Sequence, residues 1–266
     1  MQIVGERINT SRKRMRAAVE EKDAAFIQKD AKKQVAAGAT LVDVNCGTFV
    51  HDEPERLAWL VDVVQDAVDA PLCIDSPNPK ALEMGLAHNR NSQPMINSIT
   101  DEAERFSQVL PLVLEYKASI VALCMGDGGM PGSAGERFEA AARLIERLTG
   151  AGVPIGDIYV DPVVCPISTG GEYGRHVLDA IRRIMETFEG VHTICGLSNV
   201  SFGLPFRKLI NQNFLTMCMA EGLDAVILDP LDARMMSNLI ASEALLGKDD
   251  FCMNYVTAHR EERLVL

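Results

Sequence analysis

The sequence predicts a (β/α)8 TIM barrel, an α/β fold formed by one domain over residues 1–266. Three observations predict it. Eight short, apolar, β-rich segments recur along the chain, segments with helical periodicity separate them, and no linker rich in Pro, Gly or Ser divides the sequence. The length of 266 residues fits this fold, because barrels of about 250 residues commonly form a single domain.

The eight predicted strands are too uniformly apolar to leave one face in water. Such strands are typical of a parallel sheet that is covered by helices. They are expected at residues 2–5, 40–45, 71–75, 94–97, 119–125, 157–161, 192–198 and 224–229.

The segments between the strands repeat apolar residues at every third or fourth position, which predicts helices that pack one face on the sheet. Clear stripes are Ile27, Ala31 and Val35, then Leu57, Leu60, Val61 and Val64, and later Ile210, Phe214 and Met217. Glycines in "AAGATLVDV" and "AEGLDAVILD" are placed to end a helix just before a strand. Neither GxGxxG nor GxxxxGK[ST] occurs, which disfavours an open nucleotide-binding sheet.

Composition and charge exclude several classes of partner. The formal net charge of −11 disfavours a nucleic-acid partner, which requires a basic face. No apolar run reaches the length of about 18 residues that a membrane span needs, and the first residues do not resemble a secretory signal, so we expect a cytoplasmic protein. The basic cluster at Arg12, Lys13, Arg14 and Arg16 is either a solvated loop and helix start or a contact for an acidic partner or polyanionic substrate tail.

The seven cysteines are scattered, odd in number and mostly inside apolar runs. Because none has CxxC or Cys/His spacing, we expect small buried side chains rather than disulfides or metal ligands.

Polar side chains follow seven of the eight predicted strands, at the end of the barrel where TIM-barrel chemistry takes place. One such residue alone could simply cap the following helix. A full rim of carboxylates and amides without Lys or His can instead bind a flat heterocycle with an amidine-like edge, and it disfavours a phosphate. Mg²⁺ held by the carboxylates is an alternative, but the amides favour hydrogen bonding, so no metal site is predicted. The rim residues are Glu6, Asn9, Asp43, Asn45, Asp75, Asn97, Asp161, Ser198, Asn199 and Asp229.

Seven motifs on successive predicted units carry a family resemblance. They are "GERIN" (5–9), "DVNCG" (43–47), "CIDSPNPKALEMGL" (73–86), "MINSIT" (95–100), "YVDP" (159–162), "GLSNVSFGLP" (196–205) and "AEGLDAVILDP" (220–230). Together they resemble the pterin-binding methyltransferase family, which includes the methyltetrahydrofolate:corrinoid protein methyltransferases and the folate-binding module of cobalamin-dependent methionine synthase. Dihydropteroate synthase shares this fold, but this chain has "CGTFVHDEP" where that family has a Gly-Glu-Ser-Thr-Arg loop after strand 2. This chain also lacks the basic Ser-Arg-Lys that the synthase carries after strand 7 or 8.

The resemblance implies an enzyme of one-carbon metabolism that moves a methyl group between N5 of tetrahydrofolate and the cobalt of a corrinoid, in a direction the sequence does not decide. It places Asp75, Asn97 and Asp161 on the pterin edge, and it makes Asn199 the amide that reaches N5. It also implies a substrate-binding set completed by Glu6, Asn9, Asp43, Asn45, Gly196, Ser198, Arg207 and Ile227.

The expected chemistry explains why an amide would be needed at that place. A tertiary amine such as N5 is a poor leaving group, so its displacement requires protonation or strong hydrogen bonding in the transition state. Asn199 can donate such a bond, and a water with Asp75 could complete a proton relay. We therefore predict Asn199 and Asp75 as the catalytic pair.

The corrinoid is expected on a separate protein, because none of the five histidines lies in a DxHxxG context. Loops 126–135 and 166–174 are candidate docking surfaces. Gly126 and Asp127 depart from the family, in which an Asn follows the Met of strand 5, so a role for strand 5 in pterin binding is in doubt. The resemblance suggests a homodimer. A pterin-binding subunit without activity of its own and a metal-dependent barrel hydrolase stay open as alternatives.

Overall fold

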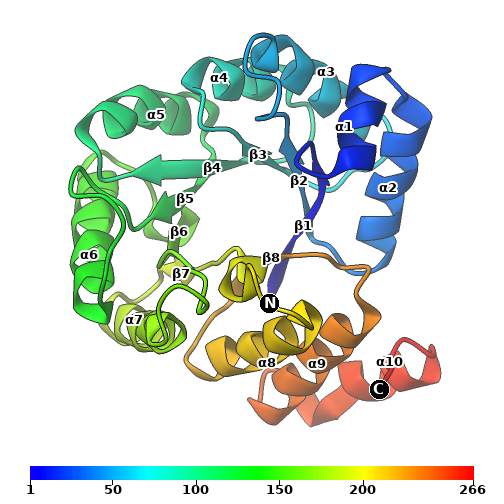
Figure 1. Cartoon of the computed structure of the whole chain (residues 1–266), viewed down its shortest axis with the longest axis vertical. Coiled ribbons are helices and arrows are strands. Elements are labelled where there is room, and N and C mark those ends of the chain that lie inside the picture. Colours follow the sequence, from blue (N-terminus) through cyan, green and yellow to red (C-terminus); the bar gives the residue numbers. More distant parts are fainter.

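The computed structural model describes all residues of the chain, 1–266. Eight strands form a central ring, and the helices surround it (Figure 1). The strands are β1 (Gln2–Asn9), β2 (Leu41–Asn45), β3 (Leu72–Asp75), β4 (Met95–Thr100), β5 (Ser119–Leu123), β6 (Ile158–Asp161), β7 (His192–Thr193) and β8 (Ala225–Leu228).

Ten α-helices cover the outside of the ring, and no helix in the chain combines the length and the apolar character that crossing a membrane would take. They are α1 (Lys13–Glu20), α2 (Ala24–Ala36), α3 (Glu53–Gln65), α4 (Pro79–His88), α5 (Ala103–Tyr116), α6 (Ala134–Gly150), α7 (Tyr173–Thr187), α8 (Arg207–Ala220), α9 (Ala233–Leu245) and α10 (Met253–Arg260). The 3-10 turns are η1 (Ile155–Asp157), η2 (Leu197–Ser201) and η3 (Asp250–Cys252).

All strand pairs are parallel, and the order around the sheet is β7-β6-β5-β4-β3-β2-β1-β8. A single parallel bridge between Gly196 and Ile227 closes the ring, and there the Ile227 N–H donates to the Cys195 carbonyl at 3.0 Å. The predicted TIM barrel is confirmed.

The core has two layers, as the doubly apolar strands predict. Between sheet and helices lies a cluster of 43 buried residues. Inside the barrel a smaller group of seven forms a plug, and nearly every strand or its continuation contributes one side chain. The plug consists of Val4, Leu41, Cys73, Met95, Val121, Ile194 and Ala225. It fills the barrel below the polar ends of the strands.

The lower end of the ring is reinforced where β7 is short. His192 Nδ1 lies 2.6 Å from Asp224 Oδ2, and the Thr193 N–H donates to Asp224 Oδ1 at 2.9 Å. Tyr159 of β6 stacks on the His192 ring with centroids 4.7 Å apart. This group joins β6, β7 and the start of β8 at the end opposite the polar rim.

The predicted strand at 192–198 is wrong beyond Thr193. Beyond Thr193 only single bonds to the neighbouring strands remain, from the Ile194 N–H to the Val160 carbonyl at 2.9 Å and at the Gly196–Ile227 bridge. The chain then forms η2, in which Leu197 and Val200 are each only 1% exposed. A short apolar run does not distinguish a buried strand from a buried turn, because both bury the same side chains. The seven-residue strand is thus replaced by a turn that brings Ser198 and Asn199 to the rim.

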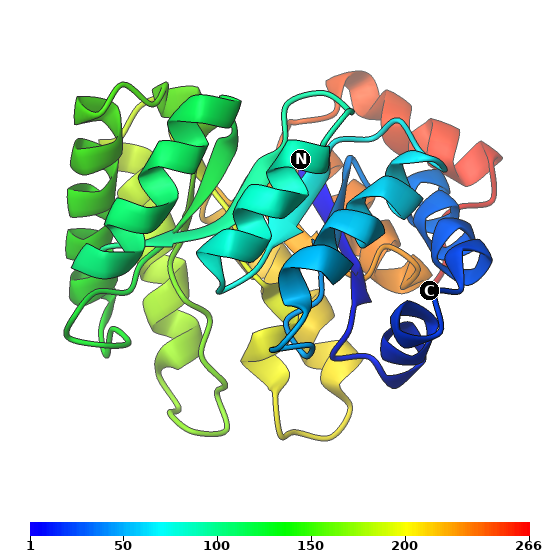
Figure 2. The same cartoon turned by 90° about the horizontal axis from the view of Figure 1, so that it is seen from above.

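Two other strands run further than predicted. β1 continues to Asn9 with a register shift between Gly5 and Ile8, and β4 continues to Thr100 with a shift between Asn97 and Ile99. Such irregularities re-aim side chains near the end of a strand. The loops that follow the strands gather on one side of the molecule, and α10 lies toward the other (Figure 2). Six of the seven cysteines are buried as free thiols, and Cys252 is exposed.

Candidate functional site

A cavity of about 560 Å³ lies at the carboxyl ends of the strands, above the apolar plug. It combines residues from β1, β2, β3, β4, β5, β6, β8, η2 and α8 with loop residues between them. The lining residues are Glu6, Asn9, Ser11, Arg12, Asp43, Asp75, Asn97, Leu123, Asp161, Gly196, Ser198, Asn199, Arg207 and Ile227. Every binding residue predicted from the sequence lies in this set except Asn45.

Parallel register explains why residues distant in sequence meet here. Asn45 pairs with Asp75, and Asp75 pairs with Asn97, so the ends of β2 and β3 form one row with the middle of β4. Leu123 pairs with Asp161 on the neighbouring strands β5 and β6. Asn45, Asp75, Leu123 and Asp161 are the last residues of β2, β3, β5 and β6, and their side chains therefore lie at one end of the barrel.

Asn45 supports the cavity without lining it. Its Nδ2 donates to Asp75 Oδ2 at 2.9 Å, and its Oδ1 accepts from the Gly47 N–H at 2.9 Å. The amide is thereby fixed at both ends and orients the Asp75 carboxyl. The predicted helix-capping alternative does not hold for Asp75, because Asn78 caps α4 by accepting from the Lys80 N–H.

Three aspartyl groups in the cavity have no ion-pair partner. Burial raises the pKa of Asp75 and of Asp161 to about 6. Burial, together with the charge of Asp75, raises the pKa of Asp43 well above its usual value. The Oδ1 atom of Asp43 is also buried without a hydrogen-bond partner. Each group would be stabilised by a ligand that donates hydrogen bonds.

Glu6 adds a fourth acidic group at the rim. Burial and the charge of Asp229 raise its pKa to about 7, while Arg12, Arg207 and Arg7 act in the opposite direction. Its carboxyl can therefore change protonation near neutral pH.

The turn η2 places the side-chain amide of Asn199 at the cavity. A Cβ atom at Gly196 would lie 3.3 Å from Asn199 Nδ2, so glycine leaves room for this amide. The Asn199 side chain is exposed and makes no hydrogen bond within the protein. Arg207 holds the turn from α8, because its Nη2 donates to the Ser198 carbonyl at 2.7 Å and its Nε donates to Ser201 Oγ at 3.0 Å.

The sequence prediction missed three lining residues, Ser11, Arg12 and Leu123. Arg12 belonged to a basic cluster for which two interpretations were open, a solvated loop and helix start or a contact for an acidic partner or polyanionic substrate tail. Its position just after β1 was the signal for the cavity. Asp229, predicted at the rim, does not line the cavity, because its carboxylate pairs with Arg7 at 2.8 Å and with Arg12 at 3.5 Å.

A TIM barrel whose strand ends enclose a polar cavity, acidic at its floor, belongs to the class of barrels that bind a small donor-rich ligand at the carboxyl end of the sheet. Within that class the assignment is specific. The chain belongs to the family described as "Pterin binding enzyme", whose sequence profile matches residues 5–229. The family resemblance expected from the seven motifs is confirmed.

Two relatives show which members of this family the chain is similar to. A methylcorrinoid:tetrahydrofolate methyltransferase from Eubacterium limosum is 36% identical over 266 residues, which cover 99% of this chain and 98% of that protein. The methionine synthase of Mycobacterium tuberculosis is 32% identical over 238 residues, which cover 85% of this chain but only 20% of that protein. This chain is therefore similar to one portion of that much longer protein.

Solved structures support the fold alone. Dihydropteroate synthase from Yersinia pestis superposes with a TM-score of 0.72 at 15% identity, over 93% of this chain and 94% of that chain. Dihydropteroate synthase from Xanthomonas albilineans, in complex with indole-2-carboxylic acid and 6-chloroguanine, superposes with a TM-score of 0.70 at 16% identity. The superposition covers 93% of this chain and 92% of that chain.

We predict that Asp43→Asn makes the ligand-free protein more stable at high pH. The folded-state pKa of Asp43 is raised, so its ionisation opposes folding; this cost is absent below about pH 4 and grows until the pH passes the folded-state value. At about pH 8 the free energy of unfolding should exceed that of the unsubstituted protein by about 1–3 kcal/mol, with a smaller gain at about pH 5.

Urea unfolding at the two pH values measures this difference. Asp127→Asn, in an exposed loop, is the matched control and should change little. An Asp43→Asn protein that is equally stable or less stable at the higher pH would contradict the interpretation that ionisation of the buried Asp43 opposes folding.

Proposed function

We propose that the chain, acting as one pterin-binding domain over residues 1–266, is a methyltransferase. It moves a methyl group between N5 of tetrahydrofolate and the cobalt of a corrinoid carried on a separate protein. The observation that carries this proposal is the cavity in which Asp75, Asn97 and Asp161 meet Asn199 at the carboxyl end of the barrel. Similarity along the whole chain to a methylcorrinoid:tetrahydrofolate methyltransferase supports it.

The acidic floor of the cavity suits the amidine-like edge of a reduced pterin. That edge offers N–H donors side by side, and a carboxylate can accept two of them at once. Asp161 and Asp75 provide such acceptors, and the Asn97 amide can both donate and accept. Ile227 supplies an apolar surface for the ring. We assign Glu6, Asn9, Asp43, Gly196, Ser198 and Arg207 to the same substrate-binding set, with Asn45 positioning Asp75.

Asn199 acts at N5 in this proposal. When methyltetrahydrofolate is the donor, electron density returns to N5 as the methyl group leaves, and a hydrogen bond from Nδ2 becomes stronger as that charge develops. Asp75, with its pKa near 6, can exchange the proton that N5 requires through a water. In the reverse direction the same residues hold tetrahydrofolate as the nucleophile, so one site serves both directions.

The methyl carrier must reach the open end of the cavity. Loops 126–135 and 166–174 follow β5 and β6 on the side of the molecule where the strands end (Figure 2). In the first loop Met130 is 59% exposed. We propose these loops as the contact for the corrinoid protein. A cytoplasmic location is part of the same proposal, since the cysteines are free thiols of the kind that a reducing compartment maintains.

Turnover by the purified chain tests the function. Incubation with tetrahydrofolate and a methylated corrinoid protein, or methylcobalamin, should form methyltetrahydrofolate, and the reverse mixture should consume it. Folate binding without turnover under any of these conditions would favour a subunit that is inactive alone. Loss of turnover with EDTA would favour the metal-dependent alternative.

Two substitutions in the cavity should separate chemistry from binding. Asn199→Ala should slow methyl transfer about 100-fold and weaken folate binding much less, because its bond forms mainly in the transition state. Asp161→Asn should mainly weaken binding. Calorimetric titration and single-turnover rates measure both effects, and the exposed Asn254→Ala serves as control. Equal losses of rate and affinity in Asn199→Ala are the result that the assignment does not allow.

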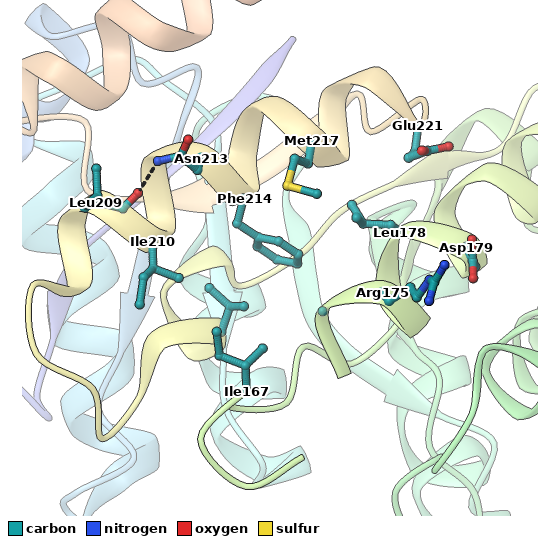
Figure 3. A pocket seen from close by; sticks show the side chains of 12 residues that line it. Ile167, Arg175, Leu178, Asp179, Leu209, Ile210, Asn213, Phe214, Met217 and Glu221 are labelled. Carbon is teal, nitrogen blue, oxygen red and sulfur yellow. Dashed lines mark hydrogen bonds between the residues drawn. The ribbon is translucent and has the colours of Figure 1, made fainter. Parts of the chain in front are cut away.

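We also propose that two copies form a homodimer through the outer faces of α7 and α8. A largely apolar groove of about 630 Å³ lies between these helices, with Phe214 and Leu178 directed into it (Figure 3). Leu209 and Met217 of α8 also line this groove and are 54% and 52% exposed. An apolar surface of this kind favours a buried, self-complementary contact.

Met217→Glu should convert the dimer to a monomer, because it places a charge within the contact. Sedimentation velocity measures the change. Leu245→Glu, at an exposed position outside the groove, should leave the dimer intact. A protein that is monomeric before any substitution would refute this contact.

A further inference from the structure

The largest side chain with no exposed surface in the protein is that of Arg137, in the first turn of α6. No carboxylate forms an ion pair with it. Its Nη1 donates to the carbonyls of Pro131 at 2.9 Å and Ser133 at 3.1 Å, and its Nη2 donates to the Val163 carbonyl at 3.2 Å. Its Nε has no partner. A buried cation held only by neutral groups is costly, which indicates that this position serves something beyond packing.

Val163, which accepts one of these bonds, has an unusual backbone conformation. Its φ angle is +61°, in the left-handed region that β-branched residues rarely adopt. In this conformation the Val163 N–H donates to Asp161 Oδ1 at 2.8 Å, and the Val163 carbonyl accepts from Arg137. The strained residue is therefore held at both ends, by the cavity carboxylate on one side and by the guanidinium on the other.

We propose that Arg137 is a positioning residue for Asp161. Its buried guanidinium holds Val163 in the left-handed conformation, and this keeps the Asp161 carboxylate oriented and ionised as a hydrogen-bond acceptor in the cavity. For the ligand, the inference rests on the proposed function, in which Asp161 accepts from the amidine-like edge of the pterin.

The charges around Asp161 support this role. The N–H groups of Val163 and Gly196 and the charge of Arg137 lower the pKa of Asp161, against the larger opposing effect of burial. The titratable groups that face it from the segments just after β5 and β7 are the thiols of Cys124 and Cys195. Burial raises the pKa of Cys124, and a hydrogen bond with Cys218 together with burial raises the pKa of Cys195, so both thiols stay neutral. Arg137 is thus the only charged side chain that acts on Asp161 in the direction of ionisation.

The test is the titration of Asp161 itself in the ligand-free protein. With ¹³C-labelled aspartate, and Asp161→Asn to assign the signal, the carboxyl carbon should titrate near the value of about 6 in the unsubstituted protein. In Arg137→Met its pKa should rise by about one unit or more, and in Arg137→Lys, which keeps the charge but not the fork, by less. Arg147→Met, on the same helix but paired with Asp101, should leave the titration unchanged. An unchanged Asp161 pKa in Arg137→Met would overturn the proposal.

A second readout excludes a purely structural role. Tetrahydrofolate affinity of Arg137→Met should fall about threefold or more near pH 6.5 and recover near pH 8.5, because Asp161 ionises again at the higher pH. The rate at saturating folate and high pH should not change. An affinity loss that is equal at all pH values would contradict the inference.

Folding failure and failure of the proposed function remain distinguishable. If Arg137→Met does not fold, the double variant with Val163→Gly removes the strain, since glycine adopts positive φ without a steric cost. The double variant should fold and should show the same raised Asp161 pKa, and an unshifted value there would also overturn the proposal. If the unsubstituted protein does not bind tetrahydrofolate, the proposed function fails, while the ligand-free titration still decides the role of Arg137.

Discussion

Asp43, Asp75 and Asp161 lie in one barrel mouth without a cation in contact with any of them, and this constraint governs the structure around the site. Each carboxyl loses hydration on folding, and its pKa rises as a result. A fold that places such groups together needs a rigid frame, and the closed parallel sheet with its apolar plug provides one. The destabilised carboxylates then form a preorganised acceptor surface for a ligand rich in N–H donors.

The protein moderates this constraint through neutral intermediaries rather than ion pairs. Asn45 donates to Asp75, and the Val163 N–H donates to Asp161. An arginine lies near each of these two carboxyl groups, Arg105 near Asp75 and Arg137 near Asp161. Both arginines donate to backbone carbonyls. Arg105 donates to Ser76 and Ser98 behind Asp75 and lowers its pKa, as Arg137 does for Asp161. Positive charge therefore acts on the cavity from a distance and leaves the carboxylate oxygens free for a ligand.

Periodicity and strand-end chemistry predicted the barrel and nearly all of the cavity, because parallel register necessarily brings the ends of strands together. They could not predict how the ring closes. The run at 192–198 is apolar enough for a strand, yet a two-residue strand and the turn η2 replace it, and that turn presents Asn199. Arg137 also gave no signal, since an arginine in the first turn of a helix looks solvated until the loops that bury it are known. For Arg12 a solvated loop and a contact for an acidic partner or substrate tail both stayed open for the same reason.

The central claim is that this ring of carboxylates and amides binds a reduced pterin, with N5 toward Asn199. A crystal structure of the protein with tetrahydrofolate tests it most directly. The account predicts the pteridine ring in the cavity of about 560 Å³, with its amidine-like edge hydrogen-bonded to Asp75, Asn97 and Asp161 and with N5 within hydrogen-bond reach of the Asn199 amide. A pteridine bound elsewhere, or bound in the cavity with N5 directed away from Asn199, would contradict it.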